Sequence, residues 1–454
     1  MFPDPPADAT LAPDPLTLAG DPLTLAGGPS RPPGRAAGSN GGNERGRPAL
    51  PPAVRRRDIT RTADCRQTAS AAAVLQAALD HGPVARSTVA RLAGLSPAAV
   101  SRLCADLAGA GLLRDAPEAA GPKGVGRPHV PVDVDTGRRV VCAVHIAVRD
   151  ATLALLDLRG RVVASERIPL PGVPPRPALL QVARRVTGFV AEHADGRAPL
   201  GVGVATGGWV DPDNGILVEH PVLGWRGVPV RDIMAAATGL PVRVDNHSRA
   251  LARAERMFGD TRARASIVHL FIGNVVDAAF ATGGLVHHGP RSAAGAITHL
   301  PLDGRADPCQ CGRRGCLQAV VSSRALAQRA ARAGIIGEPS FPDLLAAARA
   351  GDKRATALFR DRTRLVGAAA ALLLDVLNPE VLVVTESGTA HLRECLELLR
   401  QEVRRRSTVT GDPGRRVVAT SFGADALPVA GGAVMLDAVY ASPLRDRNAV
   451  SRAS

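Results

Sequence analysis

The 454-residue chain contains almost no lysine. Of its 56 basic residues, only Lys123 and Lys353 are lysines, and the rest are arginines. With 42 acidic residues, the formal net charge is +14. Strong positive charge is common in nucleic-acid-binding proteins. However, arginine in place of lysine, with abundant alanine, glycine and proline, is what GC-rich coding produces in any protein. The global charge therefore carries little weight, and local patterns have to identify a nucleic-acid-binding region.

The sequence also lacks the patterns of export and membrane insertion. Its first residues are acidic and proline-rich, without the basic segment and apolar run of a signal peptide. The apolar stretch LVGAAAALLLDVLN (365–378) is short for a bilayer span and contains Asp375. The seven cysteines are an odd number with three clustered, which does not suggest a disulfide framework. We therefore expect a cytoplasmic protein without membrane association.

Both ends of the chain are poor in bulky apolar residues. Residues 1–57 are rich in proline, glycine and alanine and contain the heptad DPLTLAG twice, at 14–20 and 21–27. So little apolar surface cannot offset the entropy lost on ordering. The sequence predicts a disordered tail over 1–57 and a short C-terminal tail over 443–454.

Three helical segments follow the first tail. ASAAAVLQAALDHG places its apolar residues on one face and stops at Gly82-Pro83. STVARLAG is expected to start at a Ser87 cap and to end at Gly94. SPAAVSRLCADLAGAG opens with Ser96 as N-cap and Pro97 at the first helical position. Two short helices joined by a tight, glycine-containing turn are typical of a helix-turn-helix.

In a helix-turn-helix, the second helix enters the major groove with its N-terminus first. The residues at or near base edges and phosphates would then be Ser96, Ala98, Ser101 and Arg102. Positive charge is locally enriched, because residues 55–114 contain nine arginines and four aspartates. The alternative interpretation is an ordinary trihelical packing module.

The stretch GPKGVGRPHVPVDV that follows predicts a β-wing. Within it, Arg127 between a glycine and a proline resembles a minor-groove probe, because a narrow groove attracts an extended arginine. The cap, the turn and the basic wing together favour double-stranded DNA as the partner of a winged helix-turn-helix over residues 58–137.

From Arg138 onward, strand and helix patterns alternate. Strand patterns lie within 140–168, with a turn at Arg159-Gly160, and at 200–210, 240–246, 265–273, 275–286 and 380–384. Helical patterns lie at 176–193, 247–257, 323–334, 341–376 and 389–405. This alternation indicates α/β architecture in two lobes, which we place at 138–245 and 246–442.

A cluster of cysteines lies in the second lobe. Cys309, Cys311 and Cys316 form C-x-C-x4-C, and His299 stands ten residues upstream. Tetrahedral zinc takes four nitrogen and sulfur ligands of these types. A full protein shell leaves no position open for water, so the sequence predicts a structural zinc site. The alternative is three free thiols that are close together by chance.

Several motifs resemble the ROK family (repressors, open reading frames and sugar kinases). The zinc motif GxxxHxPxxxxxxxCxCGxxGC is the most specific of them, and GVGVATGGWVDP, HPVLGW, VDNHSRALARAE and LNPEVLVV accompany it. The resemblance covers about residues 60–440. It implies a winged helix-turn-helix head on a two-lobed, actin-like ATPase/sugar-kinase fold. In that family the zinc knuckle shapes the sugar pocket, and its histidine lies near the sugar.

The resemblance also shows where the chain departs from the family's kinases. Their Asn-Asp pair, in which aspartate is the base, is here Asn246-His247. Their Asp-x-Gly-Gly-Thr loop falls on 145–149, and Gly-Thr-Gly-x-Gly falls on 273–277, where Asp277 would repel phosphate. Their Gly-Gly-Gly near the adenosine is 385–387, Thr-Glu-Ser. We therefore expect no enzyme activity and no ATP as cofactor.

The expected sugar site is depleted as well. The family's two glutamates that bind sugar hydroxyls are Ala296 and Gln318 here, and its asparagine within HPVLGW is Val222. The remaining polar candidates for an effector site are Asn246, His247, His299 and Gln318. A pocket needs several such groups to hold a sugar in competition with water, so we do not expect an ordinary hexose. Either the lobes sense a sugar-derived effector or another ligand, or they serve mainly as a dimerisation scaffold.

Together these observations predict a cytoplasmic transcription regulator, more readily a repressor than an activator. It would be a homodimer or tetramer on a palindromic operator, because paired heads match a two-fold site. The alternative from another class is a sugar kinase that carries an accessory head. A third reading is a DNA-binding scaffold without a ligand.

Overall fold

The computed structural model describes residues 56–119, 130–170 and 172–444, with side chains described from residue 66 onward. The residues from Arg56 onward form one compact unit. The predicted tails 1–57 and 443–454 fall almost entirely outside the described ranges, as does the predicted wing residue Arg127. They remain predictions.

The N-terminal part has the helices and strands of a winged helix-turn-helix. They are α1 (Arg56–His81), α2 (Arg86–Ala93), α3 (Pro97–Gly109), β1 (Leu113–Asp115), η1 (Pro117–Ala119) and β2 (Val132–Val134). β1 and β2 pair antiparallel, and this hairpin forms the base of the predicted wing. The core of this N-terminal part is made by apolar side chains from all three helices, among them Val74, Val89 and Leu107. The apolar residues that the sequence places on one face of these helices are therefore the residues that pack into the core.

The caps of the two short helices differ from each other. Ser96 is the N-cap of α3, and its hydroxyl accepts a hydrogen bond from Ala99 N at 3.3 Å. Ser87 is not the cap of α2, contrary to expectation. The N-cap is Ala85, two residues earlier, which has no side-chain acceptor, and its carbonyl accepts a hydrogen bond from the backbone N–H of Val89 at 3.0 Å. Backbone bonding sets this start, so the serine pattern misplaced it.

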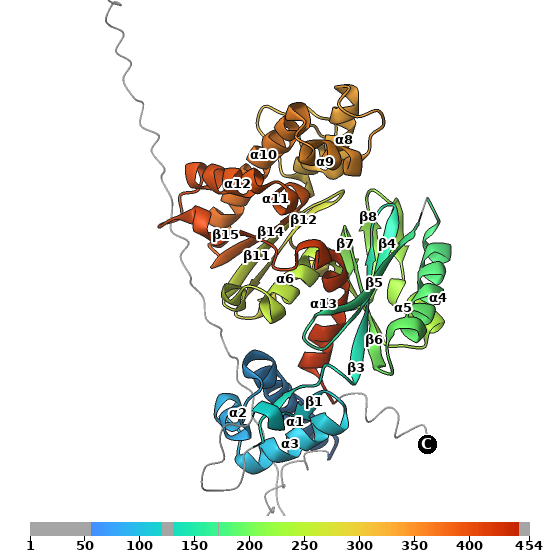
Figure 1. Ribbon diagram of the computed structural model, residues 1–454, viewed down its shortest axis with the longest axis vertical. Helices are drawn as coiled ribbons and strands as arrows, with labels where there is room; N and C mark the ends of the chain where they lie inside the picture. The colour runs from blue at the N-terminus through green and yellow to red at the C-terminus, as the bar shows by residue number, and fades with distance from the viewer. Residues whose placement is uncertain (1–55, 120–129, 171, 445–454) are drawn as a thin grey trace, which may run out of the picture. The chain divides into compact units, whose positions relative to one another are not determined.

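The first lobe is built on a sheet with strand order β10-β6-β3-β4-β5. Its strands are β3 (Arg139–Ile146), β4 (Asp150–Leu156), β5 (Val162–Pro169), β6 (Ala198–Thr206) and β10 (Val242–Asn246). β3, β4 and β5 form an antiparallel meander, and β6 and β10 run parallel to β3. Two helices cover one face, α4 (Pro175–His193) and α5 (Val230–Thr238) (Figure 1). A small antiparallel sheet follows β6 and consists of β7 (Trp209–Asp211), β8 (Ile216–His220) and β9 (Trp225–Val228).

The second lobe repeats this topology, with strand order β13-β12-β11-β14-β15. Its strands are β11 (Ser266–Ile272), β12 (Val276–Thr282), β13 (Leu285–Val286), β14 (Val381–Glu386) and β15 (Val417–Ala419). The first three are antiparallel, and β14 and β15 run parallel to β11. Helices α10 (Lys353–Leu377) and α12 (Arg393–Arg406) contact one side, and α6 (His247–Phe258) contacts β11 and β12 (Figure 1). Because the topology repeats, the β3–β4 and β11–β12 turns are equivalent positions in the two lobes.

The shorter helices connect these elements. They are η2 (Thr261–Arg264), η3 (Pro290–Ser292), η4 (Ile297–His299), α7 (Leu317–Val321), α8 (Ser323–Arg332), α9 (Phe341–Arg349), α11 (Ser387–His391), η5 (Pro413–Arg416) and η6 (Gly423–Asp425). The predicted helix over 341–376 is two helices, α9 and α10. The chain turns between them at Gly351, whose φ of +92° is not helical.

Helix α13 (Ala426–Ala441) is the central element that the sequence reading missed. It packs against β3 and β6 of the first sheet and against α6. The approach is so close that a Cβ on Gly203 would lie 2.1 Å from the Gly431 carbonyl oxygen. A helix that is apolar on nearly every side has no amphipathic period, so its sequence lacks the pattern that predicts a helix with one buried face.

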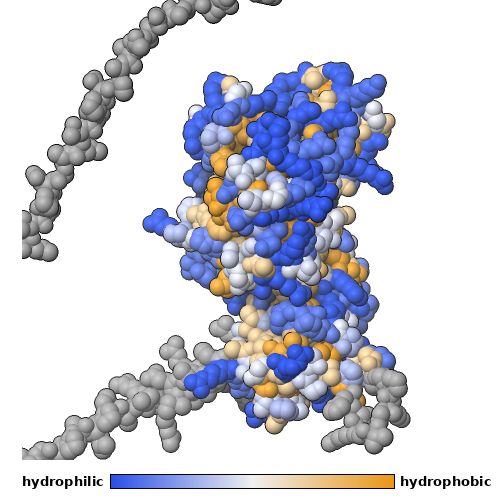
Figure 2. Space-filling view, turned by 90° about the vertical axis from the view of Figure 1, so that its left-hand side faces the viewer, coloured by the Kyte–Doolittle hydropathy of each residue, from blue (hydrophilic) through white to orange (hydrophobic). Residues whose placement is uncertain are grey.

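Helix α13 also lies within an apolar helical segment. Gly423–Ala441 is long and apolar enough to cross a membrane by length and composition, but 67% of it is buried inside the fold. A buried core helix passes the same test, so the segment gives no membrane assignment. The face in Figure 2 is mostly hydrophilic, with separate hydrophobic patches. Among the described residues, the exposed large apolar side chains are Leu92, Leu285, Leu372 and Val376.

Candidate functional site

The four predicted metal ligands converge. His299, Cys309, Cys311 and Cys316 each offer one ligand atom, and these atoms all lie within 4.8 Å of one another. Cys309 Sγ is 3.5 Å from His299 Nδ1, and Cys311 Sγ is 3.7 Å from Cys316 Sγ. Tetrahedral zinc with bonds of about 2.0–2.3 Å needs ligand atoms roughly 3.5–4 Å apart. The cluster could therefore hold a metal ion of this size.

Backbone turns bring the ligands together in this segment, which we call the knuckle (residues 299–316). Antiparallel bridges join Pro301 to Cys316 and Pro308 to Arg314. Gly315 allows the tightest contact, because it has a φ of +69° and a Cβ there would lie 2.4 Å from the Arg305 carbonyl oxygen. Gly315 thus has a steric reason for its place in the motif.

A pocket of about 670 Å³ lies beside the knuckle, and we call it the knuckle pocket. Two of the four predicted effector residues, His299 and Gln318, line it. The side-chain oxygen Oε1 of Gln318 accepts a hydrogen bond from Val276 N at 3.0 Å, which leaves the side-chain NH₂ group for other partners. Arg324 also lines the pocket and is exposed. This arrangement offers polar groups to a small polar ligand.

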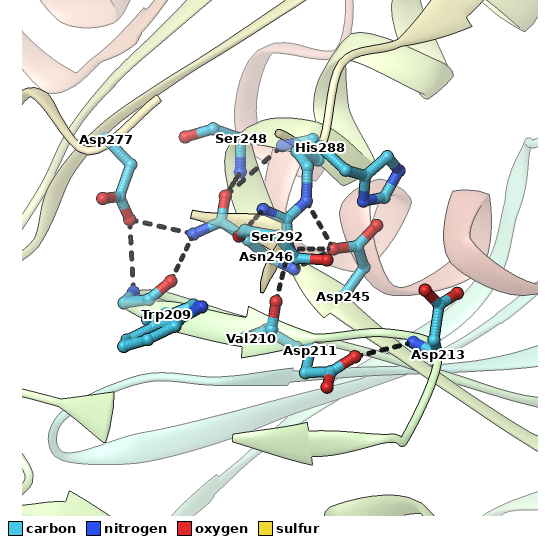
Figure 3. A network of polar contacts seen from close by, with 12 residues as sticks. Trp209, Val210, Asp211, Asp213, Asp245, Asn246, Ser248, Asp277, His288 and Ser292 are labelled. Carbon is cyan, nitrogen blue, oxygen red and sulfur yellow. Dashed lines mark hydrogen bonds and ion pairs between the residues drawn. The ribbon is translucent and has the colours of Figure 1, made fainter. Parts of the chain in front are cut away.

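The other two predicted effector residues are buried between the lobes and line neither of the two described pockets. We call this region the inter-lobe centre and define it by Gly208, Asn246, His247 and Asp277. Asp277 Oδ2 accepts hydrogen bonds from Gly208 N at 3.2 Å and from Asn246 Nδ2 at 3.0 Å (Figure 3). His247 Nε2 lies 3.3 Å from the same oxygen. The Asp277 carboxylate on β12 thus binds Gly208 N of the first lobe, the Asn246 side chain at the end of β10 and the His247 ring at the start of α6.

The electrostatics of the inter-lobe centre follow from this pairing. Burial alone would raise the pKa of Asp277, but its hydrogen bonds and its attraction to His247 hold the pKa below the ordinary value. The carboxylate is therefore ionised at neutral pH. An anion fixed at this point repels other anions in the same space.

Buried histidines surround the centre. His145 stacks on His247 with ring centroids 5.8 Å apart, and His247 contacts the Phe271 ring at 3.8 Å. Burial, with repulsion from His247 and His220, lowers the pKa of His145 to about 3. Burial likewise lowers the pKa of His220 to about 4 and that of His269 to about 3. These three rings are neutral at physiological pH. They lie on β3, β8 and β11, respectively.

A second buried network ties the lobes together (Figure 3). Asp245 pairs with Arg249 at 2.6 Å and with Arg253. Burial would raise the pKa of Asp245, but Arg253 and Arg249 hold it below the ordinary value. Arg249 also donates to the Val210 carbonyl of the first lobe at 2.8 Å and to the Ser292 carbonyl of the second at 2.9 Å.

Trp209 makes a further bond between the lobes. Its indole N–H donates to the Arg291 carbonyl at 2.7 Å. Arg291 and Ser292 have φ angles of +55° and +56°, which non-glycine residues adopt only at a cost of about 1–3 kcal/mol each. The Trp209 and Arg249 donors hold the carbonyls of this strained pair. The segment leads directly through η4 to His299, so it connects the lobe contact to the knuckle.

The position that corresponds to the adenosine contact of the family's kinases is also paired internally. Glu386 lies 3.3 Å from Arg362, and both side chains are buried. The Arg362 guanidinium lies over the Phe341 ring, 5.3 Å from its centroid, and donates to the Ile272 carbonyl at 3.2 Å. The sequence shows the substitution at Glu386 but not its partner Arg362, which lies 24 residues earlier, on α10.

The predicted DNA-contacting side chains that the structure describes lie on one face of α3. Ser96, Ala98, Ser101 and Arg102 are exposed, whereas Val100, Leu103 and Leu107 of the same helix are buried. No hydrogen bond or ion pair within the described residues engages the Arg102 guanidinium. The exposed face is thus available to an external partner.

The comparisons with known proteins agree with this geometry. Residues 141–437 match the model of the ROK family. The transcriptional regulator Rv0485 of Mycobacterium tuberculosis is 34% identical over 389 residues, which cover 83% of this chain and 86% of that protein. The DNA-binding transcriptional repressor Mlc of Escherichia coli is 25% identical over 79% of this chain and 90% of its own length.

A solved structure covers the head as well as the lobes. The crystal structure of a ROK family transcriptional regulator, a homolog of the E. coli Mlc protein, aligns with a TM-score of 0.70 at 24% identity. The alignment covers 84% of this chain and 98% of that one. The fold is therefore that of a ROK regulator, a winged helix-turn-helix head on a two-lobed sugar-kinase-like body. The chain belongs to the ROK family.

Proposed function

We propose that this protein is a DNA-binding transcriptional regulator, acting as a repressor, whose kinase-like lobes do not catalyse phosphoryl transfer. The single observation that carries the proposal is the exposed face of α3, with Ser96, Ala98, Ser101 and Arg102 facing outward from a packed helix-turn-helix. The named regulators among its relatives support it. Arg127 would add a minor-groove contact from the wing.

The inter-lobe centre supports the absence of catalysis. Phosphoryl transfer needs a base on the acceptor hydroxyl and a phosphate cradle made by backbone amides. Here Asp277 is an anion where phosphate would have to approach, and it already takes the N–H groups of Gly208 and Asn246. Glu386 and Arg362 form a buried ion pair at the position that corresponds to the adenosine contact. We therefore expect no binding site for ATP.

The knuckle is proposed to hold one structural Zn²⁺. The donor set of one imidazole and three thiols is the set that zinc prefers, and four protein ligands leave no place for a substrate water. The metal would fix His299 at the edge of the knuckle pocket. It would thereby connect the knuckle pocket to the strained segment at Arg291 and Ser292.

The knuckle pocket is the proposed effector site, with His299 and Gln318 as its polar groups. A sugar derivative that needs few hydroxyl contacts suits their chemistry. Asn246 and His247 would act only indirectly, through the contact between the lobes. We further propose a cytoplasmic homo-oligomer, dimer or tetramer, because a palindromic operator matches paired heads.

The test is selection of duplex DNA from a random library by the full-length protein. We expect a two-fold symmetric motif to be enriched. Arg102→Ala should then weaken binding to the selected duplex by about tenfold or more, since base and phosphate contacts are each worth about 1–3 kcal/mol. Arg349→Ala removes an exposed arginine on α9 and should leave affinity unchanged. Failure to enrich any sequence, or full affinity in Arg102→Ala, would overturn the proposal.

A further inference from the structure

A second pocket, of about 610 Å³, lies where the helix-turn-helix meets both lobes, and we call it the junction pocket. Its walls come from α1, the β4–β5 turn, the end of α6, η2 and the segment that leads into α13. It shares no lining residue with the knuckle pocket. It is therefore a separate site, and none of the sequence motifs pointed to it.

The rim of the junction pocket is basic. Its charged lining residues are Arg159, Arg161, Arg264 and Asp425. Arg159 pairs with Asp133, and Arg264 pairs with Asp80 at 2.9 Å. Within the described part of the chain, the Arg161 guanidinium has no hydrogen bond or ion pair, and the residue is exposed. The rim thus offers one guanidinium that has no partner among the described residues, beside two that are paired with aspartates.

The floor of the pocket is apolar. Leu79, Met257, Phe258, Phe422 and Val429 line it. The β4–β5 turn lies directly on this floor, because a Cβ at Gly160 would come within 2.6 Å of the Phe258 ring. The backbone of Arg161 is therefore held beside an aromatic surface.

We propose that the junction pocket binds a small organic acid with an aromatic or branched apolar body, whose carboxylate pairs with Arg161. The planar guanidinium suits a carboxylate, which it can bind through two parallel hydrogen bonds. The volume lies within the range of about 300–1,000 Å³ that is usual for small-molecule sites. A hexose fits poorly, because the five apolar floor residues offer no partners to its hydroxyl groups.

The position of the pocket gives the ligand a route to regulation. One wall is α1, whose Asp80 and Leu79 contact the lobes through Arg264 and Arg159. A ligand that favours one arrangement of these contacts can change DNA affinity by at most the free energy with which it discriminates between the arrangements. This coupling rests on the proposed function, whereas ligand binding at the junction does not.

The experiment uses the full-length protein without DNA, so that binding is judged apart from regulation. Melting temperature and calorimetric affinity are measured with phenylacetate, with neutral phenylacetamide and with acetate at matched ionic strength. Phenylacetate should raise the melting temperature of the wild type, because it binds only the folded state. Phenylacetamide and acetate should raise it far less.

Two charge reversals locate the ligand. Arg161→Glu changes an exposed side chain without a protein partner, so the fold should persist, and the affinity for phenylacetate should fall about tenfold or more. Arg324→Glu makes the same change at the knuckle pocket and should leave the affinity unchanged. The proposal is overturned if phenylacetate fails to bind the wild type, if phenylacetamide binds equally well, or if Arg324→Glu rather than Arg161→Glu abolishes binding. None of these results would affect the DNA-selection test.

Discussion

The knuckle lies within the second lobe and the inter-lobe centre lies between the two lobes, and they arrange their polar atoms in opposite ways. In the knuckle, four ligand atoms converge within 4.8 Å, with thiols and an imidazole facing one another. In the inter-lobe centre, the Asp277 carboxylate is already matched by Gly208 N and Asn246 Nδ2. Convergent donors of one chemical type indicate a site for an external ion. Complementary donors and acceptors indicate a contact that the chain completes by itself.

The largest effect should come from removing a knuckle ligand. Structural zinc contributes an apparent binding free energy of about 10–16 kcal/mol in small zinc domains, so Cys316→Ser should release the metal and lower the melting temperature strongly. Metal content and thermal unfolding measure both. Cys395→Ser makes the same change at a buried cysteine outside the knuckle and should keep the full metal content. Equal metal content in both variants would contradict the assignment of a zinc site to the knuckle.

The next effect concerns the buried charges between the lobes. Asp245→Ala leaves Arg249 and Arg253 without their carboxylate, and breaking a buried pair in this way costs about 3–5 kcal/mol. Urea unfolding gives the value. As a control, Asp232→Ala removes a carboxylate that is exposed on α5 and should change stability by less than about 1 kcal/mol. A similar small change in both variants would mean that the network does not hold the lobes.

Acid should weaken the fold through the buried histidines. The pKa values of His145, His220 and His269 are lowered from 6.5 to about 3, 4 and 3, so the unfolded chain binds more protons than the folded one below pH 6.5. Their contribution is complete above pH 6.5 and is lost as pH falls toward 4, by about 1 kcal/mol per histidine per pH unit. Unfolding in urea at several pH values tests this. His145→Phe should make the pH dependence shallower, and an unchanged slope would contradict the assignment.

The smallest effect is that of one hydrogen bond. Trp209→Phe keeps an aromatic ring but removes the N–H that donates to Arg291, so the free energy of unfolding should fall by about 0.5–1.5 kcal/mol. Trp225→Phe is the comparison on strand β9 of the same sheet, where no indole hydrogen bond is found among the described residues. A larger loss in Trp225→Phe would mean that ring packing, and not the Arg291 contact, decides the result.

The sequence predicted the parts of the fold that follow a local period or a fixed spacing. The three N-terminal helices, the Ser96 cap, the turn at Arg159-Gly160 and the convergence of the four knuckle ligands are all present. It failed where the decisive contact is distant. Helix α13 lacks an amphipathic period, because the chain covers it on nearly every side.

The candidate site shows the same limit. His299 and Gln318 line a pocket as the resemblance implied, but Asn246 and His247 do not. Their partner Asp277 lies 31 residues from Asn246, on strand β12 of the second sheet. From the sequence, Asp277 could be interpreted only as a negative charge that would repel phosphate. The Arg362–Glu386 pair and the junction pocket likewise depend on elements that meet only in the folded chain.

The most direct measurement is calorimetric titration of the full-length protein with magnesium–ATP. Because Asp277 already bonds across the inter-lobe centre and the Arg362–Glu386 ion pair lies at the position of the adenosine contact, we predict no saturable binding at nucleotide concentrations where kinases of this fold would be saturated. Saturable binding that Asp277→Gly strengthens would show that the space between the lobes still accepts a triphosphate. It would contradict the account of a regulator whose lobes have closed on their own side chains.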